Sequence, residues 1–451
     1  MKKTTHRNIL RAAAGASALA LALTGCGGAA SSAATSAASE ATSTASSTAA
    51  AATGEKETLE FYHGYFHDEA TWAPAAIMRE IYDDFAAQHA DGDVVFKPIP
   101  VENKEDIMKN MVSGGKFPDM IDLAGSAMSA GAVAQGLVYD MKPYLDQEKL
   151  QDQIGINYTQ NEKDGAIYTV HDQLLTIGYW YNEQIMKDAG ATMPDTWATW
   201  DDFSTAMGAV RTYGAANGIY AYGAGQGSSR IFNAMLALSD EGKAMLEGEL
   251  TPDMVKSETF ASAFKAVAAM DQENGSQNTS NTANDFSADF NEQKSSVFFN
   301  GVWAAGGFGE ETNFQPAVFP GDVALSSAGA GFCIASGMSE AKTQLALEFV
   351  KYMTSEEVQT RIFAEVGANP CNTKLDLAAL AAASGNASTE LLAKACSQAN
   401  SAATIVPTMD AVWGSDVNDI ISTKLQECAV SGTDIEAKAA EMQDELVAIL
   451  S

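Results

Sequence analysis

The sequence predicts an α/β protein with two domains, and three observations support this. The chain from about Glu55 to Ser451 is roughly 400 residues long, which is too long for one small core and suits two domains. Predicted strands alternate with predicted helices, which indicates parallel sheets with helical crossovers. Hydrophobic residues make up 46% of the chain, as in globular proteins.

The alternation is clearest at the start of this region. A strand is expected at 58–62, and Pro74 opens an amphipathic helix that runs to about residue 89. A second strand at 93–100 precedes a helix at 104–113, which the following Gly-Gly pair ends. A short apolar strand at 120–123 comes next. These elements form the expected beginning of the first domain.

The extreme N-terminus has the features of an export signal. Basic residues are followed by a small, apolar stretch at 12–23 that is too short to span a bilayer as a permanent helix. The following Leu23-Thr24-Gly25-Cys26 resembles the bacterial lipobox, in which the cysteine receives lipid before cleavage. We therefore expect a lipoprotein signal peptide at 1–25 and lipidation of Cys26. The alternative is an ordinary secretory signal with a chance cysteine.

The segment 26–55 is expected to be a disordered tether behind Cys26. It consists almost entirely of Ala, Ser, Thr and Gly, so it has no large apolar side chain to bury. Two or more acyl chains on Cys26 would hold the protein stably on a membrane. We expect it on the extracellular face of the cell membrane, in a Gram-positive cell.

Charge and motif content exclude several functions. The formal charge of −31 disfavours nucleic acid as a partner. The chain has no G-x-S-x-G, H-E-x-x-H or P-loop motif, so no enzyme activity and no cofactor are expected. The acidic and polar stretch 271–289 lacks the order of a calcium loop, and no metal site is expected.

Four cysteines follow Cys26, and their spacing indicates no zinc site. Two alternatives remain open for them. One is a disulfide between Cys396 and Cys428, both in the helical last third of the chain. The other is four buried free thiols, with Cys333 and Cys371 as the remaining two.

Several segments together resemble bacterial extracellular solute-binding proteins of the sugar-binding group, which includes the maltose-binding proteins. The matching segments occur in the family's order and cover most of the chain after the tether. In Phe290–Trp303 the chain departs from the family, with Gln293-Lys294 for Gly-Lys and Ser296-Val297 for Ala-Met. The segments are Gly115–Asp122, Gly136–Leu145, Tyr179–Asn182, Pro194–Phe203, Phe290–Trp303 and Ala346–Gln359.

The resemblance implies a two-lobe periplasmic-binding-protein-like fold with a hinge and an inter-lobe cleft. Lobe one would comprise 56–170 plus 327–372, and lobe two 171–326 plus 373–451. A hinge of this kind lets two lobes close around a ligand. The implied protein is a monomer that binds a solute and docks on the permease subunits of an ABC importer.

Candidate ligand-binding residues come from the chemistry of sugars. Aromatic faces suit the C–H patches of a sugar, and Asp, Gln or Arg side chains suit its hydroxyls. The expected positions are loops at the carboxyl ends of strands. Each candidate could instead be a core or surface residue. The candidates are Trp303, Trp413, Asp122, Tyr179, His63, Tyr65, Gln173 and Arg230.

The expected function is capture of a sugar or oligosaccharide for import. The alternatives are a receptor of the same fold for a polyamine, an organic anion or a metal chelate, and a secreted enzyme acting on glycosides. Strong acidity suits a cationic ligand, but net charge describes the surface more than a cleft. Aromatic residues mixed with neutral polar groups favour a neutral sugar.

Overall fold

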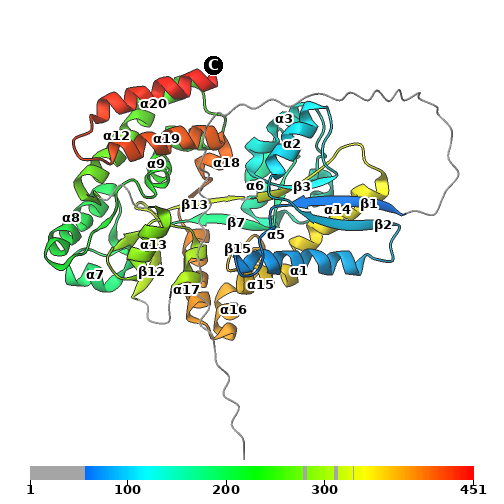
Figure 1. Cartoon of the computed structure of the whole chain (residues 1–451), viewed down its shortest axis with the longest axis horizontal. Coiled ribbons are helices and arrows are strands. Elements are labelled where there is room, and N and C mark those ends of the chain that lie inside the picture. Colours follow the sequence, from blue (N-terminus) through cyan, green and yellow to red (C-terminus); the bar gives the residue numbers. More distant parts are fainter. Residues whose placement is uncertain (1–55, 278–281, 309–312, 329) are drawn as a thin grey trace, which may run out of the picture.

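The computed structural model describes residues 56–277, 282–308, 313–328 and 330–451. It shows two α/β lobes lying side by side (Figure 1). We call the half with the five-stranded sheet lobe one and the half with the three-stranded sheet lobe two. The predicted signal peptide, the tether and Cys26 lie outside the described residues. The exact limits of the lobes stay a prediction.

Lobe one is built on a mixed sheet in the order β2-β1-β3-β14-β6. β1 runs parallel to β2 and β3, whereas β14 is antiparallel to β3 and β6. The late strand β14 thus completes a sheet whose other strands come from the first part of the chain. The strands are β1 (Glu57–His63), β2 (Val94–Pro100), β3 (Met120–Ala124), β6 (Val170–His171) and β14 (Ala330–Ile334).

Helices cover both faces of this sheet. On one face, α1 (Ala73–Gln88) and α14 (Glu340–Met353) pack Phe85 and Phe349 against Phe61 of β1. On the other face, α2 (Lys104–Ser113) and α3 (Gly125–Ala134) lie over β3. The period-two pattern of β3 explains this arrangement, because successive side chains point to opposite faces.

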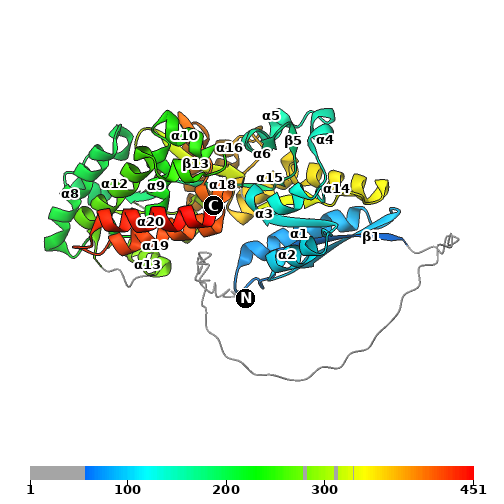
Figure 2. The ribbon, with the colours of Figure 1, turned by 90° about the horizontal axis from the view of Figure 1, so that it is seen from above.

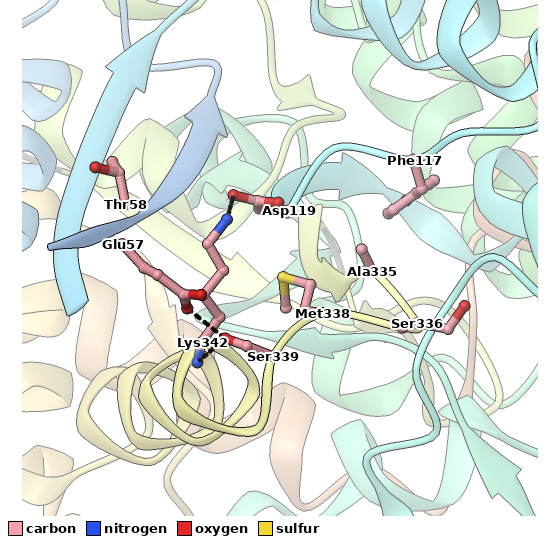
Figure 3. A pocket seen from close by; sticks show the side chains of 10 residues that line it. Glu57, Thr58, Phe117, Asp119, Ala335, Ser336, Met338, Ser339 and Lys342 are labelled. Atoms are coloured by element: carbon pink, nitrogen blue, oxygen red, sulfur yellow. Dashed lines mark hydrogen bonds and ion pairs between the residues drawn. The ribbon is translucent and has the colours of Figure 1, made fainter. Parts of the chain in front are cut away.

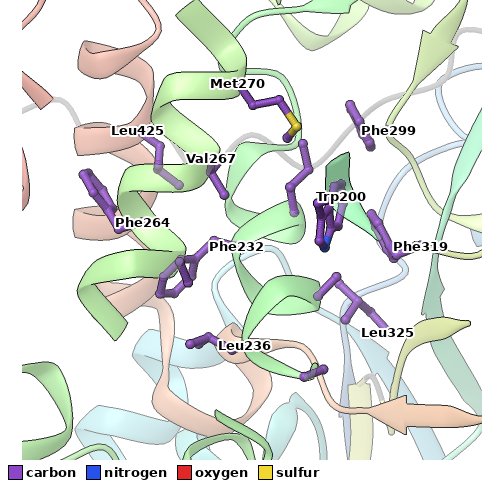
Figure 4. Close-up of a cluster of buried hydrophobic side chains, with 14 of the residues drawn as sticks. Trp200, Phe232, Leu236, Phe264, Val267, Met270, Phe299, Phe319, Leu325 and Leu425 are labelled. Carbon is purple, nitrogen blue, oxygen red and sulfur yellow. The ribbon is translucent and has the colours of Figure 1, made fainter. Parts of the chain in front are cut away.

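Lobe two has a small antiparallel sheet within a large helical layer. Its strand β8 (Tyr179–Asn182) lies between β11 (Val297–Phe298) and β12 (Phe314–Ala317). The core shown in Figure 4 includes Trp200, Phe232, Phe264 and Leu425. They come from α8 (Trp200–Asn217), α9 (Ser228–Leu236), α12 (Glu258–Asn274) and α19 (Ser415–Cys428). Figure 2 shows α19 beside α20 (Ile435–Leu450) along the outside of the lobe.

Three connections pass between the lobes within one sheet, ordered β15-β7-β13-β16. Thr176 Oγ1 and Ser326 Oγ lie 2.8 Å apart, and Asn369 Nδ2 donates to Thr176 Oγ1 at 2.8 Å. These buried bonds join all three connections. The three connections are β7 (Gln173–Ile177), β13 (Val323–Ala328) and β15 (Asn369–Pro370), and the fourth strand, β16 (Thr404–Val406), pairs with β13.

Shorter elements complete the chain, and none of the described helices is long and apolar enough to cross a membrane. They are α4 (Lys142–Gln147), α5 (Gln151–Ile154), α6 (Ile156–Asn161), β4 (Glu162–Lys163), β5 (Ala166–Ile167), α7 (Glu183–Asp188), η1 (Pro194–Thr196), β9 (Tyr222–Gly223), α10 (Asp240–Leu246), α11 (Pro252–Val255), β10 (Gly275–Ser276), α13 (Ala283–Asn291), η2 (Val302–Gly307), α15 (Glu356–Arg361), η3 (Ile362–Val366), α16 (Leu377–Ser384), α17 (Ala387–Asn400) and α18 (Met409–Trp413).

The disulfide alternative for the cysteines is wrong. Cys333, Cys371, Cys396 and Cys428 are all buried and free. Cys396 belongs to the hydrophobic cluster around Trp180, whereas Cys428 belongs to the main core of lobe two. Because the two thiols lie in separate clusters, no bridge joins them. The four-thiol alternative is the one that the structure contains.

Candidate ligand-binding site

The carboxyl ends of two lobe-one strands place charged and polar groups together. His63 ends β1, and Asp122 lies in the neighbouring β3, with both side chains buried. The Asp122 carboxylate accepts from the backbone N–H of Gly64 at 3.2 Å and forms an ion pair with Lys104. Lys104 is the first residue of α2, so its ammonium reaches back over the end of β1.

Gly64 leaves room for this ion pair. A Cβ atom at this position would lie 3.1 Å from Lys104 Nζ, which is tighter than ordinary van der Waals contact. No sequence motif marks Lys104 as a site residue. A lysine at the first position of a helix is common on protein surfaces, and only the fold brings it to a buried acid.

His63, Tyr65 and Gln173 join the same group. His63 Nδ1 accepts from the backbone N–H of Tyr65 at 3.3 Å, and Gln173 Nε2 donates to the Tyr65 hydroxyl at 2.9 Å. Burial lowers the pKa of His63 to about 4, although the charge of Asp122 opposes the shift. The imidazole is therefore neutral at pH 7. Four of the predicted site residues thus form one cluster with Lys104, which we call the polar cluster.

Asp172 lies beside the polar cluster, next to Gln173. Its side chain is buried, and its Oδ1 has no hydrogen-bond partner among the described residues. Burial, helped by repulsion from Asp122, raises the pKa of Asp172 to about 8. The carboxyl group is therefore mostly protonated at pH 7, when it can donate as well as accept a hydrogen bond.

Trp303 in lobe two is partly exposed and lies across a glycine. The side chain of Trp303 is 37% exposed. A Cβ atom on Gly301 would lie 2.1 Å from the indole ring, so the ring packs directly on the backbone of Gly301. The indole N–H of Trp180 donates to the carbonyl of Gly301 at 3.1 Å and holds this segment in place.

Arg230 supports the segment that carries Trp303. Its Nη1 donates to the carbonyl of Phe299 at 3.3 Å, and Gln226 Nε2 donates to the same oxygen at 2.6 Å. Gln226 Oε1 also accepts from the Phe299 N–H at 3.1 Å. The guanidinium therefore holds backbone just before Trp303, and a direct contact of Arg230 with a ligand stays a prediction.

Tyr179 requires a correction. It is only 2% exposed, and its ring stacks on Trp197 at a centroid distance of 6.2 Å inside the core of lobe two. Because this ring packs in the core of lobe two and is not part of the polar cluster, we place Tyr179 in the core. Both faces of β8 are covered, since the adjacent Trp180 is buried as well, and sequence alone did not reveal this.

Trp413 has an intermediate position. Its ring lies 6.1 Å from that of Phe260, and its indole N–H donates to the carbonyl of Met245 at 3.0 Å. Its helix α18 belongs to lobe two but lies against α3 of lobe one. Trp413 thus sits in a helix that contacts both lobes, and its contact with a ligand stays a prediction.

A separate hollow of about 440 Å³ lies at the other end of the lobe-one sheet (Figure 3). It is lined by Glu57 and Thr58 at the start of β1, whereas His63 ends that strand. Lys342 in this hollow pairs with Asp119 at 2.7 Å. The hollow is therefore distinct from the polar cluster. Within the described residues, no group of three or more His, Cys, Asp or Glu side chains could hold a metal ion.

Comparison with known proteins defines the family. The model of a bacterial extracellular solute-binding protein family matches residues 80–414. The chain belongs to this family. A solute-binding protein of Streptococcus pneumoniae, solved with the blood group A-trisaccharide, is 48% identical, with a TM-score of 0.78. The match covers 87% of this chain and all of that one.

More distant relatives share the fold of this solute-binding protein. A chitin oligosaccharide binding protein is 19% identical with a TM-score of 0.65, and the match covers 86% of this chain and 98% of that one. The apo-form of RafE from Streptococcus pneumoniae is 16% identical with a TM-score of 0.67, and the match covers 88% of this chain and 98% of that one. No curated protein sequence matches the chain. The family and these neighbours are binding proteins, and all have the two-lobe α/β architecture.

Proposed function

We propose that this solute-binding protein captures a neutral carbohydrate and delivers it to an ABC importer. The observation that carries this proposal is the balance of charge in the polar cluster and the adjacent Asp172. Lys104 neutralises Asp122, His63 is neutral, and Asp172 is mostly protonated at pH 7. A cluster with paired or neutral groups suits hydroxyls, which both donate and accept hydrogen bonds.

Two further observations support a sugar rather than a polyamine. The partly exposed indole of Trp303 offers a flat apolar face of the kind that packs on sugar C–H groups. The relative that is 48% identical was solved with a trisaccharide. A polyamine would instead require uncompensated carboxylates, whereas Asp122 is paired with Lys104 and the neighbouring Asp172 is mostly protonated at pH 7.

The transport role follows from the two-lobe fold. A ligand held between the lobes shifts the population toward the closed form, because some contacts exist only there. The closed receptor, acting as a monomer, would dock on permease subunits that couple to ATP hydrolysis. The protein itself would catalyse no reaction. Lipid on Cys26 and the following tether would keep it at the extracellular face of the membrane.

Calorimetric titration tests the ligand class. We expect the blood group A-trisaccharide or another neutral oligosaccharide to bind, and spermidine and citrate to give no heat of binding. Binding of spermidine alone would contradict the proposal. For the anchor, wild-type protein should stay with the membrane fraction of the expressing cells, and a Cys26→Ala variant should be released. Equal release of both would show that Cys26 is not lipidated.

A further inference from the structure

The loop between β1 and α1 exposes a group of aromatic rings. Phe66 is 37% exposed, and its ring lies 4.1 Å from that of His67. His67 in turn meets the partly exposed Trp72 edge to face, with ring centroids 6.2 Å apart. Single exposed aromatic residues are ordinary, but here three neighbouring rings that are exposed or partly exposed follow the carboxyl end of a strand.

Hydrogen bonds to the backbone hold these rings in place. Arg79 of α1 donates from Nη1 to the carbonyls of Tyr65 and His67, at 2.7 and 2.5 Å. The Asp68 carboxylate accepts from the N–H of Thr71 at 2.7 Å and closes the turn before Trp72. The backbone of the loop is therefore ordered by its own contacts, which lowers the entropy cost of binding a ligand there.

The aromatic group is continuous with the polar cluster through Tyr65. The buried ring of Tyr65 stacks on Trp72 at a centroid distance of 5.5 Å and an interplanar angle of 23°. Its hydroxyl accepts from Gln173 within the polar cluster. One side chain thus links the hydrogen-bonding groups to the exposed rings. A ligand that extends beyond the polar cluster along this loop would meet apolar faces.

We propose that Phe66, His67 and Trp72 form a second carbohydrate subsite, which takes the C–H face of a further sugar ring. The ligand is then an oligosaccharide, and a single sugar engages the polar cluster alone. This inference rests on the proposed function. The sequence-based candidates at this end of β1, His63 and Tyr65, are buried, whereas the proposed subsite uses exposed or partly exposed neighbours.

Calorimetry on a Phe66→Ala variant tests the subsite. An aromatic contact contributes about 1 kcal/mol, so the variant should bind the blood group A-trisaccharide roughly tenfold more weakly. Its affinity for the component monosaccharides should stay within about twofold of the wild-type value, because they do not reach the loop. Val430→Ala is the matched control, since Val430 is 46% exposed in lobe two.

The outcomes separate the two proposals. Wild-type protein that binds the trisaccharide, with Phe66→Ala binding it equally well, would overturn the subsite and leave the proposed function standing. Equal loss of trisaccharide and monosaccharide affinity would also overturn the subsite. Wild-type protein that binds no carbohydrate would overturn both.

A Trp72→Phe variant gives a second readout that does not depend on affinity. Phenylalanine keeps a ring on Tyr65 but removes the indole. The trisaccharide should change the tryptophan emission of the wild type, and this change should shrink in Trp72→Phe while the monosaccharides cause the same change in both. An undiminished response to the trisaccharide would place Trp72 outside the subsite.

Discussion

Lys104, the first residue of α2, forms an ion pair with the buried carboxylate of Asp122 in the middle of β3. The ammonium passes over Gly64, where the absence of a side chain leaves it room. The pair therefore closes the carboxyl end of the lobe-one sheet. It also supplies the polar cluster with a donor and an acceptor of balanced charge.

Replacing Lys104 by methionine should destabilise the protein by about 3 kcal/mol. The substitution leaves the Asp122 carboxylate buried without its partner. Urea denaturation of the wild type and the variant at pH 7 measures the difference.

Two variants serve as controls for this prediction. Lys104→Met with Asp122→Asn should recover part of the loss, because no buried charge then lacks a partner. Lys187→Met breaks the exposed pair with Glu183 and should cost less than about 1 kcal/mol. If Lys104→Met costs no more than Lys187→Met, the Asp122 pair is not buried as described.

Asp172→Asn should stabilise the protein, and the gain should grow as the pH rises from 5 to 8. Burial raises the pKa of Asp172 from 3.8 to about 8, so the folded chain holds a proton that the unfolded chain has released. Stability from this group is therefore fully present below pH 3.8 and is lost as the pH rises toward 8, by at most about 1.4 kcal/mol per pH unit. Asparagine does not ionise and removes this loss.

Denaturation curves at pH 5, 6, 7 and 8 check the prediction. Asp91→Asn, an exposed replacement, is the control and should change stability little at any of these values. The depressed pKa of His63 affects all three proteins alike and cancels in the differences. A gain for Asp172→Asn that is constant across the series would contradict the assigned pKa.

The two predicted tryptophans should behave differently on replacement by alanine. Trp303→Ala should stay folded, because the indole is partly exposed. It should weaken carbohydrate binding by about 1–3 kcal/mol, because the ligand loses the apolar area that the indole would cover. Trp413→Ala should lower the melting temperature, because it removes the contact with Phe260 and the hydrogen bond to Met245. Thermal melts with and without trisaccharide distinguish the two. A folded Trp303→Ala variant with unchanged affinity would remove Trp303 from the site.

Thiol counting tests the state of the cysteines. In a Cys26→Ala variant without reductant, four thiols per chain should react in denaturant, and few should react in native protein, because all four are buried. Burial also raises the pKa of Cys333 to about 12 and that of Cys428 to about 11, so the reactive thiolates are scarce at neutral pH. Two thiols instead of four would mean that a disulfide forms.

Local elements were predictable from the sequence. The helix expected at 104–113 has those bounds in the structure, and the helix after Pro74 ends one residue before the expected position. Both have a regular apolar pattern with proline or glycine at an end, and such signals act within one turn. The sequence also named Asp122, His63, Tyr65 and Gln173, and the structure brings these four residues together. Their contact with a ligand stays a prediction.

Non-local relationships were not predictable. The partner of Asp122 is 18 residues away on another element, and no pattern in the sequence links the two. Tyr179 and Trp180 point to opposite faces of β8, and both are buried in different hydrophobic clusters. Their burial depends on the distant segments that cover each face, which the strand's own pattern does not reveal. In the first loop, the sequence-based candidate was Tyr65, which is buried, and not its exposed neighbour Phe66. Those distinctions depend on packing between distant segments.

The position of β14 has a consequence for synthesis and export. This strand lies between β3 and β6, although more than 150 residues of chain separate it from either. The first lobe therefore has a gap in its sheet until the ribosome has passed Ile334, and a strand pairing of such high sequence separation forms slowly. A nascent chain that cannot complete its first lobe early stays incompletely folded for longer. A secretion channel requires a chain in this state.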